Sequence, residues 1–120
     1  MRLRLLTFLF SALLSSQSFA HYFNCNISDI SISSGTPDLV YLTMGCSASN
    51  PHSSGTGGCT AANISDNIVV FDGSSELGKR YYSLALTALA SQKNTYISAY
   101  GTCPSNSTST PLVYSMKLSN

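Results

Sequence analysis

The chain has 120 residues, of which 9% are charged, and a formal net charge of +1. This length holds one small domain, and the lack of any basic run excludes the electrostatic footprint of a nucleic-acid-binding protein. Ser, Thr, Asn, Gly and Tyr must then form most of the surface, which suits uncharged or weakly charged ligands such as glycans.

The chain begins with the pattern of a secretory signal peptide. Arg2 and Arg4 precede an apolar run over residues 5–14, and small residues follow up to Ala20. We predict cleavage near Ala20, a signal peptide of residues 1–20 and a secreted or periplasmic domain of residues 21–120. The apolar run is too short to span a bilayer, so no membrane span is expected.

Two strand patterns follow and predict a β-hairpin. The first runs from Tyr22 to Ile32, and its apolar positions change parity at Ser28-Asp29, where a β-bulge would keep them on one face. The second runs from Leu39 to Cys46, after a segment of turn residues.

The hairpin register predicts how the four cysteines pair. With Ile30 facing Leu42, one bulged residue brings Cys25 opposite Cys46, near the separation that a disulfide needs. Cys59 and Cys103 then pair by elimination. An even number of cysteines in an exported chain, without C-x-x-C spacing, favours two disulfides over a zinc site.

The rest of the chain completes the fold class. A loop from Ser47 to Asp66 has no periodicity, and loops of this length often carry function. The predicted order β-β-β-α-β-β, mainly β with one helix, is the order of the OB-fold, a small Greek-key barrel. The elements predicted after the loop are strand Ile68 to Phe71, an N-cap within 72–74, helix Ser75 to Lys93, strand Thr95 to Gly101 and strand Leu112 to Leu118. In the last strand we expect Tyr114 to face inward and Val113 to face outward.

The helix has more apolar surface than one buried face requires. Its two apolar stripes are Leu77, Tyr81, Leu84, Ala85 and Ala88, and beside them Tyr82, Leu86 and Leu89. One stripe would pack on the barrel. The second stripe must be buried by something other than the barrel. We therefore expect either self-association through the helix from Leu77 to Leu89 or packing under the long loop.

The signal peptide, the short chain, the hairpin tied by Cys25 and Cys46, and the helix followed directly by a strand in "YYSLALTALASQKNTYISAY" resemble the secreted B subunits of AB5 toxins of the pertussis and subtilase type. The resemblance implies an OB-fold subunit in an oligomeric ring, sialylated or other host glycans as ligands, and a catalytic A-type subunit as partner. No residue role is carried over from that family.

Candidate ligand-binding residues come from the tyrosines and the long loop. Tyr96 and Tyr100 fall on the face opposite Ile97 and Ala99, where exposed aromatic rings could form a platform for a sugar or a protein. The alternative is that they pack under the loop or in a subunit interface. Asn50 and His52 are the loop candidates.

An alternative is a monomeric protein with a copper site. Cleavage after Ala20 would make His21 the first residue, offering an amine and an imidazole to copper, and His52 could complete the site. The leading hypothesis needs no metal or other cofactor. A third hypothesis is an accessory or inhibitor module for another exported protein.

No motif for catalysis stands out. The five acids are scattered among loops and strand ends, and the serines lack a G-x-S-x-G elbow. We therefore expect no catalytic residues and a protein that acts by binding.

Overall fold

The computed structural model describes residues 21–49 and 57–119. Its element order confirms the predicted fold class, mainly β with one helix in the order β-β-β-α-β-β. The elements are β1 His21–Ser33, β2 Leu39–Met44, β3 Ile68–Asp72, α1 Glu76–Ser91, β4 Asn94–Ala99 and β5 Val113–Leu118.

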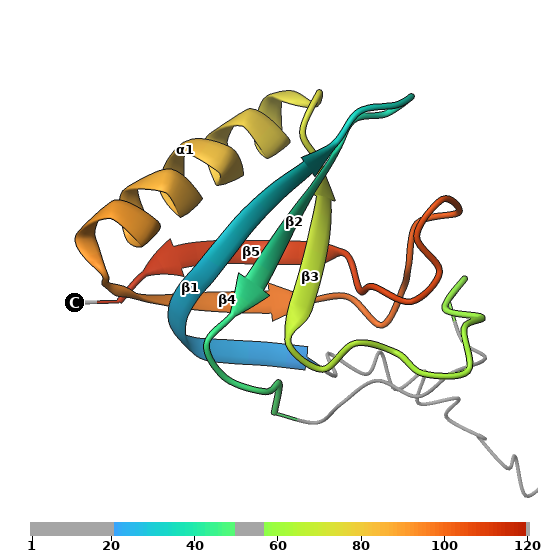
Figure 1. Ribbon diagram of the computed structural model, residues 1–120, viewed down its shortest axis with the longest axis horizontal. Coiled ribbons are helices and arrows are strands. Elements are labelled where there is room, and N and C mark those ends of the chain that lie inside the picture. The colour runs from blue at the N-terminus through green and yellow to red at the C-terminus, as the bar shows by residue number, and fades with distance from the viewer. Residues whose placement is uncertain (1–20, 50–56, 120) are drawn as a thin grey trace, which may run out of the picture.

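The five strands form an antiparallel sheet in the order β3-β2-β1-β4-β5 that curls toward closure. The long, bent β1 pairs through its first half with β4 and through its second half with β2 (Figure 1). Strand β3 meets the segment just before β5 at an isolated parallel bridge between Val70 and Leu112, where the Val70 N–H donates to the Pro111 carbonyl over 3.0 Å. This is the partly open, OB-like barrel that the sequence order predicts.

The predicted hairpin register is confirmed. Ile30 pairs with Leu42, and Ile27 pairs with Met44 across a register shift between Ile27 and Asp29, where the bulge was expected. Both predicted disulfides are present. Cys25 is bonded to Cys46, and Cys59 is bonded to Cys103.

The predicted orientation of two residues in β5 is wrong. Val113 is buried and Tyr114 is 45% exposed, the reverse of the expectation. The reason is a register shift in the β4–β5 pair: Ser98 pairs with Ser115 but Ala99 pairs with Val113, so Tyr114 lies in an irregularity that changes the strand's parity.

Helix α1 begins at a turn tied by side-chain hydrogen bonds. The N-cap is Ser75, whose hydroxyl accepts from the Gly78 N–H at 2.9 Å and donates to the Asp72 carbonyl at 3.0 Å. The Asp72 carboxylate accepts from the hydroxyl and the N–H of Ser74, and these hydrogen bonds hold the pKa of Asp72 below its ordinary value. The N-cap thus lies one residue beyond the predicted segment. At the other end, Gln92 ends the helix in the left-handed conformation.

The barrel covers only part of the apolar surface of α1. Gly78, Ala85 and Ala88 are buried, and the helix packs against β1, β4 and β5 (Figure 1). Leu77 is 54% exposed and Leu86 is 43% exposed. Because nine residues correspond to two and a half turns, these two leucines lie on opposite flanks of the helix.

The core contains one polar side chain that should weaken the fold. Thr95 is fully buried, and among the described residues its Oγ1 has no hydrogen-bond partner. Thr95→Val keeps the shape and removes the desolvation cost, so we expect the free energy of unfolding to rise by about 1 kcal/mol. Urea unfolding measures this change. Thr95→Ser, which keeps the hydroxyl and deletes the methyl group, should be less stable than wild type, and a destabilised Thr95→Val would show that the hydroxyl is bonded after all.

Candidate functional site

Three strands present a polar surface with a single charged side chain on the outside of the barrel. Because successive side chains of a strand alternate between its two faces, the residues next to the buried Phe23 and Ile97 and the partly buried Met116 point outward together. We call this surface the outer β1–β4–β5 face; its residues are Tyr22, Asn24, Tyr96, Ser98, Ser115, Lys117 and Ser119.

Two tyrosine rings and one ammonium group form the centre of this face. The Tyr22 and Tyr96 rings lie nearly parallel, at 16°, with their centroids 6.1 Å apart. Lys117 pairs with Tyr96 across β4 and β5, and its Nζ lies 5.4 Å from the centroid of the Tyr96 ring. Tyr22 is 40% exposed and Tyr96 is half-buried, so part of each ring faces solvent. This arrangement is a small aromatic platform with a cation beside it.

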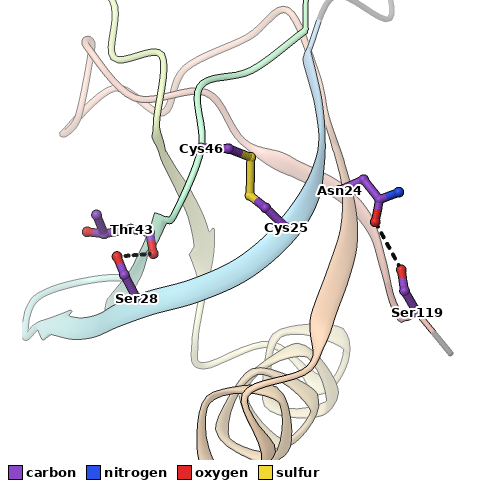
Figure 2. The surroundings of a disulfide bond; sticks show 6 residues. All are labelled: Asn24, Cys25, Ser28, Thr43, Cys46 and Ser119. Carbon is purple, nitrogen blue, oxygen red and sulfur yellow. Dashed lines mark hydrogen bonds between the residues drawn. A yellow bond between two sulfur atoms is a disulfide. The ribbon is translucent and has the colours of Figure 1, made fainter.

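Hydrogen bonding and a disulfide hold the β1 side of the face. The Ser119 hydroxyl donates to Asn24 Oδ1 at 3.2 Å, which ties the segment after β5 to β1. Figure 2 shows that Asn24 points away from the Cys25–Cys46 disulfide, which lies on the other side of β1. The Ser28 hydroxyl bonds to the Thr43 carbonyl over 3.1 Å beside the bulge. The backbone that carries Asn24 is therefore fixed from both sides of the strand.

The side chains of the face suit a neutral or weakly acidic ligand. The tyrosine rings offer apolar area to a flat CH surface, and Asn24, Ser98 and Ser115 offer hydrogen-bond donors and acceptors. Lys117 adds one positive charge, and none of the seven residues is an acid. The seven residues offer groups that contact and orient a ligand, and they include no acid and base pair placed for proton transfer.

Tyr100, the second tyrosine predicted for the platform, belongs to a different surface. It lies past the end of β4, and its ring packs edge-on against Tyr114 with a centroid distance of 4.8 Å. Together with Leu77, Tyr81 and Leu112 it lines an apolar pocket of about 150 Å³ beside the start of α1. The structure thus assigns Tyr96 and Tyr100 to two separate aromatic pairs.

Tyr81 ties the helix to β5 next to this pocket. Its hydroxyl donates to the Tyr114 carbonyl at 2.8 Å, and its ring packs edge-on against Phe71. Burial, and secondarily the nearby Tyr100 and Tyr114, raise the pKa of the Tyr81 phenol above its ordinary value.

We expect Tyr81→Phe to lower the free energy of unfolding by about 1 kcal/mol, because it removes the hydrogen bond that ties α1 to β5. The raised pKa favours the neutral phenol in the folded state. The contribution of the neutral Tyr81 phenol to the free energy of unfolding is therefore complete below the unfolded pKa of about 10. It is lost as pH rises through the folded pKa. Chemical denaturation at neutral and alkaline pH tests this. Wild type should lose stability more steeply than Tyr81→Phe above about pH 10, and identical slopes would contradict the assignment.

Two of the predicted loop residues, Asn50 and His52, lie outside the described residues. His21 is the first residue of β1 and its backbone pairs with Ala99, while its side chain is not described. In residues 21–49 and 57–119, no group of three or more His, Cys, Asp or Glu side chains is placed to hold a metal ion. The cysteines are all in disulfides.

Sequence reasoning missed Tyr22 and Lys117. Both residues have the outward parity of their strands: Tyr22 precedes the inward Phe23, and Lys117 precedes the inward Leu118. The signal that could have found them is this alternation combined with the β1–β4 pairing. That pairing joins segments far apart in the chain.

Within the part of the chain that the structure describes, no helix has the length and apolarity of a membrane span. Comparison with known proteins gives no family: no protein-family model, no curated protein and no solved structure matches the chain.

Proposed function

We propose that this chain is an exported, non-catalytic binding module whose outer β1–β4–β5 face binds a glycan. The observation that carries the proposal is the pair of nearly parallel, partly exposed rings of Tyr22 and Tyr96 with Lys117 Nζ beside them. Sugar rings have apolar CH faces that pack on aromatic rings, and their hydroxyls match the Asn and Ser side chains around the pair. Lys117 favours a sugar that carries a carboxylate.

Export is part of the proposal. Two disulfides in a domain of this size are typical of proteins that fold in an oxidising compartment, as secreted and periplasmic proteins do. The leader pattern in residues 1–20 supports the same location. We infer that the working form begins at His21.

Self-association through α1 is also part of the proposal. Leu77 and Leu86 are exposed on opposite flanks of the helix, and a subunit in a closed ring touches one neighbour on each side. By the resemblance to toxin B subunits, a ring would present several glycan sites at once and pair with a separate catalytic subunit. Light scattering on the oxidised protein from His21 onward should then give a mass of about five protomers, and the mass of a monomer would contradict the proposed ring.

Glycan binding is tested by calorimetry with a panel of neutral and carboxylate-bearing oligosaccharides. We expect Tyr96→Ala to weaken binding by about tenfold or more, because truncating a contacting tyrosine typically costs more than 1 kcal/mol. The matched control is Tyr41→Ala. Tyr41 is a half-buried tyrosine of β2 that pairs with Ser31 and Val70, away from the outer β1–β4–β5 face.

The control separates a binding role from a folding role. If both variants keep wild-type unfolding and only Tyr96→Ala loses affinity, the platform is the ligand site. Equal loss in the two variants, or full affinity of Tyr96→Ala, would place the ligand elsewhere. If the wild-type protein binds no member of the panel, the proposal that the ligand is a glycan is wrong.

A further inference from the structure

The position of the mature amino terminus suggests a second charged group for the same site. His21, the residue after the predicted cleavage point, lies in strand β1. His21 pairs with Ala99 of β4, and the next carbonyl, that of Tyr22, accepts from the Ser49 N–H over 3.1 Å. Backbone pairing therefore fixes His21 in the sheet, whereas the terminal residues of most domains are poorly ordered.

We propose that the α-amino group of His21, released by removal of residues 1–20, forms part of the ligand site, so that cleavage completes the site. The inference rests on the proposed function and on cleavage after Ala20. Before cleavage the His21 nitrogen is a neutral amide. After cleavage it is a primary α-amino group, the form that carries a positive charge on protonation.

The register places this amine at one end of the aromatic pair. Tyr22 is the adjacent residue, so the amine lies about 5 Å from the Tyr22 Cα by the dimensions of an extended strand. Tyr96 lies diagonally across on β4, and Lys117 lies beyond it on β5. The order across the three strands is therefore amine, Tyr22, Tyr96, Lys117, with one cation at each end of the two rings.

The charges around the amine favour an anionic ligand group there. The outer β1–β4–β5 face contributes the two tyrosine rings, Lys117 as its one cation and no carboxylate, so no acid on this face competes for the amine. Ser49 and Ala99, the residues bonded to the start of β1, carry no charge. A carboxylate-bearing sugar stacked on Tyr22 would be within reach of the amine.

The test compares three forms of the oxidised protein from His21 onward by calorimetry at low salt with a chelator present: the unmodified form, a form made by chemical synthesis with an acetylated α-amine, and His21→Ala. The ligands are one carboxylate-bearing oligosaccharide and its neutral counterpart. Acetylation removes the charge and adds two carbons, whereas His21→Ala keeps the amine and removes the imidazole.

We expect acetylation to weaken binding of the acidic sugar about two- to fivefold, the range for an exposed ion pair, and to leave the neutral sugar unchanged. His21→Ala should bind both sugars as the unmodified form does. Equal binding by all three forms overturns the role of the amine and leaves the proposed function standing. Loss in His21→Ala without loss on acetylation also overturns it, in favour of the imidazole. No binding of either sugar by any form contradicts the proposed function itself, and the inference with it.

Discussion

Gly78→Ala should destabilise the protein by about 2 kcal/mol or more and lower its Tm by about 10 °C. Gly78 is buried in the first turn of α1, and a Cβ there would collide with the Asp72 carbonyl oxygen. That carbonyl cannot move aside easily, because it accepts a hydrogen bond from the N-cap Ser75. The higher helix propensity of Ala, about 1 kcal/mol, offsets only part of the collision. Thermal unfolding followed by circular dichroism measures the effect.

Gly35→Ala is the matched control for this variant. Gly35 lies in the β1–β2 turn, and a Cβ there would meet the Pro37 carbonyl oxygen at an ordinary contact distance of 3.6 Å. We expect its Tm to stay within about 2 °C of wild type. A Gly78→Ala protein as stable as Gly35→Ala would show that α1 does not sit as close to the end of β3 as described.

Loss of the Cys59–Cys103 disulfide should be the other large effect. This bond joins the segment before β3 to the segment after β4 across 44 residues, and both cysteines are buried. Closing a loop of this length stabilises a fold by about 3–4 kcal/mol. The double variant Cys59→Ala with Cys103→Ala should lose that amount in urea unfolding, a large part of the 5–15 kcal/mol typical of a domain.

The Cys25–Cys46 disulfide provides the comparison. It closes 21 residues, so its removal by the corresponding double variant should cost roughly 0.6 kcal/mol less than removal of Cys59–Cys103. Cys25 and Cys46 are also half-buried rather than buried, so alanine should leave smaller cavities. If the Cys25–Cys46 variant were the less stable of the two, the loop-closure account of these bonds would be wrong.

The hairpin could be predicted from sequence because its information is local. The period of two, the parity change at Ser28-Asp29 and the turn before Leu39 together set the register, and the register brought Cys25 to Cys46. Tyr114 could not be placed in the same way. The shift between Ser98 and Ala99 reverses its side, and no glycine or proline within β5 marks that irregularity.

The candidate site depends on pairings that the sequence does not reveal. Tyr96 was identified because its own strand alternates, but its neighbours Tyr22 and Lys117 come from the two ends of the domain. They meet only because β1 bends and pairs with β4 instead of continuing along β2. Tyr100 shares the parity of Tyr96 in sequence, yet β4 ends at Ala99 and Tyr100 packs against Tyr114.

Glycan binding by the outer β1–β4–β5 face is tested most directly by a nuclear magnetic resonance titration of the oxidised protein from His21 onward with the tightest-binding oligosaccharide of the panel. We expect the perturbed amides to gather on the outer β1–β4–β5 face, at Tyr22, Asn24, Tyr96 and Lys117. Perturbations that gather instead around Tyr81 and Tyr100 at the start of α1, or no perturbation with any sugar, would contradict it.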